Sequence, residues 1–290
     1  MEPPAILRKA RTPSLQEQFV RTVILGCGYT GRRVATLLAR SGHEVVATAR
    51  DLSSLTPLPV QPVRFDAENE RDWEQCRGLI DSNTAVFHSI PPATDGEELL
   101  RPVKSVLNQA QRVVYLSTTG VYGTQTEVDE STLAAPVTHT DHSRVRMEVV
   151  VLSCPNSIVL RSAAIYGPWR GVHRAIQQGR YPLRGRGSNF VSRIHVDDLA
   201  AHCVATLFSD VGGAWPVADE DPCTAWEIAA FCAQLLGVSV PDTGHESNAP
   251  TLSANRRVNG RAITKAMGLT LRYPSYRVGI PACIAEERAF

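Results

Sequence analysis

Residues 22–41, TVILGCGYTGRRVATLLARS, decide the fold of this chain. An apolar run leads directly into three glycines at G-x-G-x-x-G spacing, Gly26, Gly28 and Gly31, and apolar residues at helical spacing follow until Gly42. Between a strand and a helix, such glycines permit a tight turn, a close approach of the backbone to phosphate and close packing of the helix on the strand. The segment therefore predicts a dinucleotide-binding turn, with a turn that is merely tight as the alternative.

The composition is that of a globular chain of enzyme size: of 290 residues, 43% are hydrophobic and 20% are charged, and the formal net charge is +1. This balance gives no electrostatic reason to expect a nucleic acid or an anionic membrane as partner. No apolar stretch approaches the ~20 residues of a transmembrane helix. The seven cysteines are scattered, with no C-x-x-C pair and no His/Cys cluster. We therefore expect reduced thiols, a cytoplasmic location and no metal site.

Alternating strand and helix patterns fill the first two thirds of the chain and predict an α/β fold, a Rossmann doubly wound parallel sheet. After the glycine turn, strands are predicted at Glu44–Ala49, Val63–Phe65, Ala85–Ile90, Val113–Ser117 and Ile158–Leu160, and helices at Leu99–Leu107 and His142–Leu152. We expect an N-terminal extension at 1–19, a dinucleotide-binding domain at 20–218 with a substrate-loop insertion at about 169–192, and a small C-terminal substrate lobe at 219–290. A targeting peptide is the alternative for the extension, because it is basic.

The C-terminal third carries clear helix-end signals. Asp197 is expected to cap a helix over Leu199–Phe208, after a strand at Arg193–Val196. The tetrapeptide TAWE at 224–227 has the form of a capping box, and Gly237 is placed to end the helix that follows. Residues 238–254 hold two prolines, a glycine and several polar residues, so they are predicted to form a loop.

The end of the second predicted strand bears on the choice of dinucleotide. An acidic residue there would accept hydrogen bonds from an adenosine ribose. Here the strand ends Thr48-Ala49-Arg50, and Asp51 comes one residue later. The Arg50 guanidinium suits a 2′-phosphate, Thr48 can add a hydroxyl, and Arg32 and Arg33 are further candidates. The prediction is therefore NADP rather than NAD, with a solvated loop cation as the alternative for Arg50.

Five segments, in order, resemble the extended short-chain dehydrogenase/reductases, and most closely their NAD-dependent epimerase/dehydratase group. They are TVILGCGYTG, the step at Asp66, VVYLSTTGVYG at 113–123, LRSAAIYGP at 160–168 and RIHVDDLA at 193–200. The tail segments NRRVNGRAITKAMG and YPSYRVGI resemble an atypical, YeeZ-like branch. The resemblance covers residues from about 20 to 207. It implies a nicotinamide dinucleotide and a small-molecule substrate, with sugar nucleotides as the suggested class, and it allows a homodimer.

The glycine turn and the resemblance together give a candidate cofactor site at the carboxyl edge of the sheet. Asp66, at the end of the third predicted strand, is placed to reach the adenine, with a turn-forming aspartate as the alternative. The candidate cofactor-binding residues are Gly26, Gly28, Tyr29, Thr30, Gly31, Thr48, Arg50, Asp66, Ser89, Ser117 and Arg144.

The resemblance also implies catalytic positions. In the family a Ser or Thr hydroxyl polarises the reacting oxygen, and this role falls on Thr118, with turn capping as the alternative. The family's Tyr-x-x-x-Lys pair falls on Thr140 and Arg144. A threonine hydroxyl is far too weak an acid to replace the tyrosine, and arginine does not exchange protons at physiological pH. His139 and His142 flank the vacant position and are candidate proton-transfer residues, with surface histidines as the alternative.

Two functions stay open from the sequence. An atypical oxidoreductase, epimerase or dehydratase would use Thr118 on a carbonyl or sugar-nucleotide-like substrate. A catalytically silent dinucleotide-binding sensor or scaffold would explain the missing tyrosine and lysine. Trp169, Arg170, Arg184 and Arg186 fall where the family's substrate loops lie and suit an anionic substrate, with solvated loop residues as the alternative.

Overall fold

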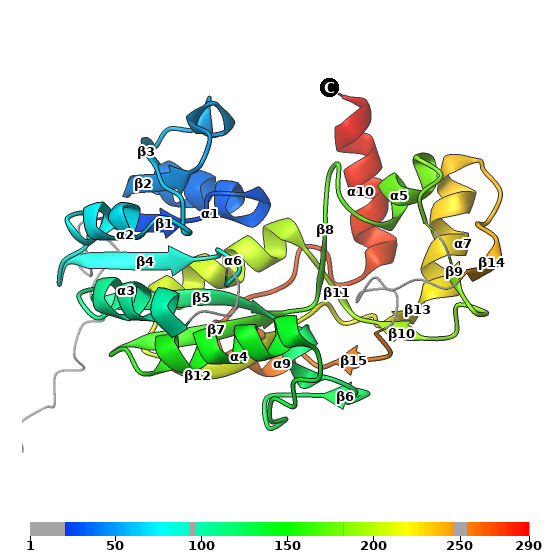
Figure 1. Ribbon diagram of the computed structural model, residues 1–290. Coiled ribbons are helices and arrows are strands. Elements are labelled where there is room, and N and C mark those ends of the chain that lie inside the picture. Colours follow the sequence, from blue (N-terminus) through cyan, green and yellow to red (C-terminus); the bar gives the residue numbers. More distant parts are fainter. Residues whose placement is uncertain (1–20, 93–96, 182, 246–253, 290) are drawn as a thin grey trace, which may run out of the picture.

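The computed structural model describes residues 21–92, 97–181, 183–245 and 254–289. Its centre is a seven-stranded sheet in which every neighbouring pair is parallel, with the order β12-β7-β5-β4-β1-β2-β3 (Figure 1). The strands are β1 (Arg21–Leu25), β2 (Glu44–Ala49), β3 (Gln61–Arg64), β4 (Thr84–His88), β5 (Arg112–Thr118), β7 (Ser157–Ser162) and β12 (Gly213–Val217). The predicted Rossmann-like α/β class is confirmed.

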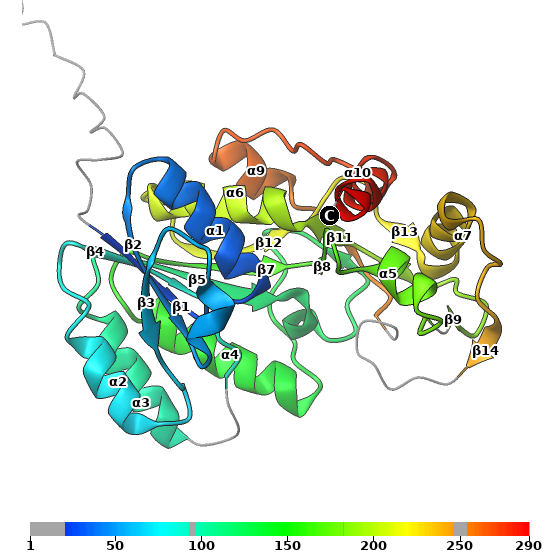
Figure 2. The same cartoon turned by 90° about the horizontal axis from the view of Figure 1, so that it is seen from above.

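Helices cover both faces of this sheet (Figure 2). They are α1 (Tyr29–Arg40), α2 (Glu70–Arg77), α3 (Glu97–Leu107), α4 (His139–Leu152) and α6 (Val196–Leu207). Alternate residues of β1 point to opposite faces, because side chains along a strand alternate: Ile24 packs with α1 and α6, and Val23 and Leu25 pack with α2, α3 and α4. Since the central strands are buried on both faces, they are apolar throughout rather than alternating.

Most predicted elements occur with ends shifted by one to three residues, and β2 has the predicted bounds. The predicted cap at Asp197 is wrong. Helix α6 begins three residues before Leu199, and its N-cap is His195, whose ring nitrogen accepts the Asp197 N–H at 3.2 Å. The neighbouring Asp198 instead accepts two backbone N–H groups from the C-terminal segment, those of Arg272 and Tyr273, each at 2.8 Å.

A second, smaller apolar core lies beyond the carboxyl edge of the sheet and joins Tyr166 and Ile176 to Ile228, Tyr276 and Ile280. Its helices are α5 (Val172–Gln177), α7 (Ala225–Leu236) and α10 (Tyr276–Arg288), and α9 (Arg261–Ala266) packs near β12. Helix α7 starts with the predicted capping box and ends at Gly237 in a left-handed conformation. No helix of the described residues has the length and apolar character needed to span a membrane.

Short strands and single-turn helices connect these parts. They are β6 (Glu127–Val128), β8 (Ala164–Tyr166), β9 (Leu183–Arg184), β10 (Phe190–Val191), β11 (Arg193–His195), β13 (Cys223–Thr224), β14 (Thr243–His245) and β15 (Arg257–Val258), with 3-10 turns η2 (Leu52–Leu55) and η3 (Thr119–Tyr122). The loop prediction for 238–254 is wrong at β14, which pairs with β9. The predicted extension at 1–19 and residues 246–253 of the predicted loop lie outside the described residues.

Candidate functional site

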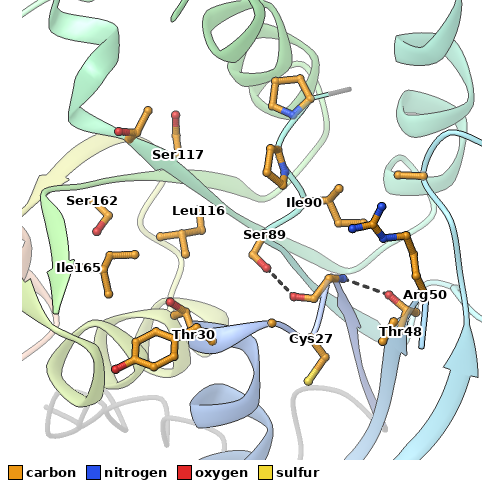
Figure 3. Close-up of a pocket in the computed structure, with 18 of the residues that line it drawn as sticks. Cys27, Thr30, Thr48, Arg50, Ser89, Ile90, Leu116, Ser117, Ser162 and Ile165 are labelled. Carbon is orange, nitrogen blue, oxygen red and sulfur yellow. Dashed lines mark hydrogen bonds between the residues drawn. The ribbon is translucent and has the colours of Figure 1, made fainter. Parts of the chain in front are cut away.

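A cleft of about 920 Å³ opens at the carboxyl edge of the sheet. It is lined by the glycine turn after β1 and by the segments that follow β2, β3, β4, β5 and β7 (Figure 3). Figure 3 shows Arg50 at one end of the cleft and Ser162 and Ile165 at the other. In open α/β sheets this edge is where ligands bind, because the helix N-termini and the strand ends converge there.

The three glycines of the turn have different physical reasons to be glycine. Gly26 has φ +84°, and Gly31 packs so closely that an added Cβ would lie 2.8 Å from the Gly26 carbonyl oxygen. Gly28 has φ −83°, and an added Cβ would meet nothing within 4 Å. Gly26 and Gly31 therefore serve the turn itself, whereas Gly28 leaves open space above the backbone.

Hydrogen bonds from two neighbouring strands hold the turn in place. The Gly26 N–H donates to the Thr48 hydroxyl at 3.0 Å, and the Ser89 hydroxyl donates to the Gly26 carbonyl at 2.6 Å (Figure 3). Cys27 is part of this turn, and burial raises the pKa of its thiol to about 11. Thr48 and Ser89, both candidate cofactor residues, line the cleft and brace the glycine backbone.

The first turn of α1 presents backbone donors to the cleft. Gly28 is the N-cap and supplies no side-chain cap, and the first turn carries no acidic residue. Uncapped N–H groups at a helix N-terminus favour an anion. Tyr29 lines the cleft, and its hydroxyl donates to the Pro168 carbonyl at 2.9 Å. Together with the open space over Gly28, this arrangement fits the pyrophosphate of a dinucleotide.

At one end of the cleft, a cation and two carboxylates lie close to the end of β2 and β3. Arg50 is exposed and lines the cleft, and none of the ion pairs between described residues involves it. The Asp51 carboxylate caps the turn η2 by accepting hydrogen bonds from the Ser53 hydroxyl at 2.7 Å and from the Ser53 N–H at 2.9 Å. These two hydrogen bonds lower the pKa of the Asp51 carboxyl group. Asp66 lines the cleft. Its carboxylate also accepts the Glu68 N–H at 3.2 Å, which is the contact of a turn-forming aspartate.

Arg33 does not line the cleft, contrary to the prediction that it is a further candidate for binding the 2′-phosphate. Its guanidinium lies 3.5 Å from the Asp197 carboxylate and 3.4 Å from that of Glu286. Arg32 is likewise outside the residues that line the cleft. Of the three arginines predicted to bind a 2′-phosphate, Arg50 is the one that lines the cleft.

The other part of the cleft contains the end of β5. Thr118 is half-buried and caps η3, where its Oγ1 accepts the Gly120 N–H at 3.2 Å. A threonine hydroxyl can also donate one hydrogen bond, and Thr118 lines the cleft. The Ser117 hydroxyl is committed to Glu148 at 2.6 Å, and Glu148 in turn forms a buried ion pair with Arg161 at 2.8 Å. Ser117 therefore lines the cleft wall as part of a buried network.

The positions of the missing tyrosine and lysine lie on α4. Arg144 lines the cleft, and its guanidinium donates to the Tyr115 hydroxyl at 3.4 Å. Thr140, His139 and His142 are exposed and are not among the residues that line the cleft. The structure thus brings Thr118 and Arg144 into the cleft and leaves the two candidate histidines outside it.

Several residues at the site were not found from the sequence. Arg256 donates hydrogen bonds to the backbone carbonyls of Thr119, Gly123 and Gln125, and so fixes the segment that follows Thr118. His88 is buried directly before Ser89, and burial lowers its pKa to about 3. The Arg256 contacts join residues more than a hundred positions apart, and no local spacing signals them.

The comparisons with known proteins agree with this geometry. The model of the NAD dependent epimerase/dehydratase family matches residues 22–217. A curated relative, the 3-diazoavenalumate denitrifying reductase of a Streptomyces species, is 32% identical over 139 residues, which are 42% of this chain and 45% of that protein. The matched segment thus spans less than half of the relative's length.

Solved structures extend the similarity over most of the chain. A functionally unknown conserved protein from Silicibacter pomeroyi DSS has a TM-score of 0.78 at 29% identity, over 92% of this chain and 98% of its own. MoeE5, solved in complex with UDP-glucose and NAD, has a TM-score of 0.76 at 22% identity, over 93% of this chain and 99% of its own. At 22% identity, the similarity to MoeE5 supports the fold alone. With its family match, sheet order and glycine turn, this chain belongs to the NAD-dependent epimerase/dehydratase family.

Proposed function

We propose that this chain is an NADP(H)-dependent oxidoreductase or epimerase that acts on a small carbonyl or sugar-nucleotide-like substrate. The observation that carries the proposal is the continuous cleft from Arg50, past the open glycine turn, to Thr118 and Arg144. A bound dinucleotide would supply hydride exchange there. Residues 20–218 would hold the cofactor, and residues 219–290, with the insertion at about 169–192, would form the substrate lobe.

Each cleft residue has a role that follows from its chemistry. The α1 N-terminus would bind the pyrophosphate through backbone N–H groups. Thr118 would donate its O–H to the reacting oxygen, since its Oγ1 is already held by the Gly120 N–H. Arg144 would hydrogen-bond a ribose or phosphate, and Asp66 the adenine. His139 and His142 would need to move into the cleft to transfer a proton, and this role has the weakest geometric support.

The preference for NADP rests on Arg50. Its exposed guanidinium has no carboxylate partner among the described residues, and the nearby Asp51 is occupied in capping η2. A 2′-phosphate would meet a cation there, whereas a ribose 2′-hydroxyl would find no uncommitted carboxylate at the end of β2.

A second function, a dinucleotide-binding sensor without turnover, is favoured by one observation. Thr140 and Arg144 stand where the family has its acid and its lysine, and Thr140 is exposed outside the cleft lining. Proton transfer typically contributes 10²–10⁴-fold to rate. Its loss would leave either a slow enzyme or a protein that only binds the cofactor.

The relatives guide the choice of substrates. MoeE5 was solved with UDP-glucose and NAD, and the Streptomyces relative is named as a reductase of a diazo compound. A substrate screen should therefore include sugar nucleotides, simple carbonyl compounds and an aryl diazo compound. All seven cysteines are free and buried, which supports the expected cytoplasmic location.

The test is a titration of NADPH and NADH into the purified protein, followed by the fluorescence of the reduced nicotinamide. Arg50→Ala should weaken NADPH binding about 10- to 150-fold, as expected for the loss of charge-assisted hydrogen bonds worth about 1.5–3 kcal/mol. The same variant should bind NADH with nearly unchanged affinity. Arg40→Ala, an exposed arginine of α1 outside the cleft, is the control. If neither dinucleotide binds at millimolar concentration, both proposed functions, the enzyme and the sensor, are refuted. Tight binding without oxidation of NADPH by any compound of the screen would favour the sensor.

A further inference from the structure

One face of the C-terminal helix α10 contacts elements that border the cleft. Gly279, Cys283 and Glu287 are spaced by four residues, so they lie on the same face of this helix. Figure 1 shows α10 beside β8 and α5. An added Cβ at Gly279 would collide with the hydroxyl group of Tyr166, so the helix backbone packs directly on the last residue of β8. The Cys283 Sγ lies 3.4 Å from Nε2 of His195, the N-cap of α6.

Glu287, the third residue of this face, holds the turn that follows β8. Its Oε1 accepts the Trp169 N–H and lies 3.0 Å from Nε2 of His173. Its Oε2 lies 3.7 Å from the guanidinium of Arg174. The Glu287 side chain is only 10% exposed, so these donors compensate a carboxylate that is largely withdrawn from water.

The turn at 167–170 has a conformation that needs such support. Gly167 and Arg170 exchange two backbone hydrogen bonds, at 2.9 and 3.0 Å. Between them, Trp169 has φ +60°, in the left-handed region, where a bulky residue is a genuine outlier. Strain of this kind persists only where the surrounding structure over-determines it. The hydrogen bond from Trp169 to Glu287 supplies such a restraint from outside the turn.

The same turn contacts the helix that carries the glycine turn. The Tyr29 hydroxyl, on the first residue of α1, donates to the Pro168 carbonyl at 2.9 Å, and both Tyr29 and Arg170 line the cleft. A second contact joins α10 to α1 directly, because the Arg33 guanidinium lies 3.4 Å from the Glu286 carboxylate. A continuous series of contacts thus runs from α10 to the N-terminus of α1.

We propose that Glu287 is a positioning residue of the dinucleotide cleft and that it links the docking of α10 to cofactor binding. This inference rests on the proposed function, because its ligand is the dinucleotide. With α10 docked, Glu287 holds the turn at 167–170, and this turn holds Tyr29 at the edge of the cleft. If the dinucleotide binds this arrangement more tightly, it stabilises the docked α10 by the same factor, because such coupling is reciprocal. The C-terminal helix, expected in the substrate lobe, therefore acts on the cofactor.

The experiment compares the full-length wild type with Glu287→Ala, Glu287→Gln and the control Thr224→Ala. Thr224 caps α7 in the same lobe and is not among the residues that line the cleft, so its loss destabilises the lobe without touching the turn. NADPH binding is followed by nicotinamide fluorescence. Hydrogen exchange of segments 166–173 and 279–288 is measured by mass spectrometry, with and without NADPH. These readouts need no turnover.

Glu287→Ala should weaken NADPH binding about 5- to 150-fold, the usual range of such couplings. Without ligand, it should speed exchange in 166–173 about tenfold or more, because the Trp169 N–H loses a charged acceptor. Glu287→Gln keeps an oxygen that can accept this N–H, so its affinity should lie between those of Glu287→Ala and the wild type. It also keeps the comparison possible if Glu287→Ala does not fold. NADPH should slow exchange in 279–288 in the wild type and in Thr224→Ala.

The inference is overturned if the wild type binds NADPH but both Glu287 variants bind it as tightly as Thr224→Ala. It is also overturned if saturating NADPH leaves exchange in 279–288 of the wild type unchanged. If the wild type binds neither NADPH nor NADH, the proposed function is refuted and the linkage with it. Exchange in 166–173 without ligand would then still report whether Glu287 holds the turn, so the two failures are distinguishable.

Discussion

Replacing Gly28 by alanine separates a dinucleotide-binding turn from one that is merely tight. The new Cβ would meet no protein atom within 4 Å, and the φ of −83° is one that alanine adopts, with a ψ of −149° that glycine tolerates better. The structural cost is confined to the helix N-cap, where alanine is poorer than glycine by up to about 1 kcal/mol. We therefore expect the free energy of unfolding to fall by no more than about 1 kcal/mol.

The same methyl group would occupy the space that the pyrophosphate needs. Overpacking typically costs about 1–3 kcal/mol, and the same cost at the phosphate would weaken NADPH binding about 5- to 150-fold. Gly31→Ala is the matched comparison, because its Cβ would lie 2.8 Å from the Gly26 carbonyl oxygen. That variant should lose about 1–3 kcal/mol of folding stability even without ligand.

Urea unfolding and NADPH fluorescence titration on the two variants give both quantities. Gly28→Ala should fold almost as stably as the wild type and bind poorly, and Gly31→Ala should be destabilised before any ligand is added. A Gly28→Ala protein that binds NADPH with unchanged affinity would refute the reasoning, since the space over Gly28 would then have no ligand to receive.

Three further predictions concern groups that the fold buries. Glu148→Gln leaves the Arg161 guanidinium buried without its carboxylate, so urea unfolding should show a loss of about 3–5 kcal/mol; a loss below 1 kcal/mol would contradict this. The pKa values of His88 and His195, about 3 and about 4, lie below the usual histidine value, so the unfolded state binds these protons more readily. The free energy of unfolding should be highest above the usual histidine pKa and should fall as the pH decreases below that value, by about 1.4 kcal/mol per pH unit for each histidine. His88→Phe should reduce this pH dependence, and an unchanged pH dependence would contradict the prediction. Asp198→Asn should lose about 1–3 kcal/mol in urea unfolding, because one of two buried backbone N–H groups loses its acceptor; unchanged stability would show that the amide satisfies both.

The sequence predicted those parts of the fold that local chemistry determines. The glycine turn, the strand at Glu44–Ala49 and the capping box at Thr224 depend on residues close together in the chain. Strand β12, the seventh of the sheet, was missed, because Gly213 and Pro216 weaken its pattern and only its pairing with β7 makes it a strand. Helix α10 contains Pro281 and was not predicted either.

The candidate site divides in the same way. Thr48, Ser89 and Thr118 lie at or directly after the carboxyl ends of strands of one parallel sheet, so their convergence at that edge could be inferred from strand order alone. The orientation of Tyr29 toward Pro168 and the pairing of Arg33 with Glu286 could not, because both depend on segments more than a hundred residues away. For the same reason, the sequence suggested Arg32 and Arg33 as further 2′-phosphate ligands beside Arg50, although of these three only Arg50 lines the cleft.

In the proposed site, cofactor binding and proton transfer are physically separable, because they use different groups of the protein. The proposed dinucleotide site consists of the backbone N–H groups at the N-terminus of α1 and the open space over Gly28, beside a turn braced by Thr48 and Ser89, and it needs no titratable side chain. Thr118 can polarise an oxygen by the same kind of neutral hydrogen bond. The absence of the family's tyrosine would therefore leave the proposed binding, orientation and polarisation in place and would change only the source of the proton. A substrate or water that supplies this proton would make the protein an enzyme, whereas a bound cofactor with no such proton donor beside it would make the protein a sensor.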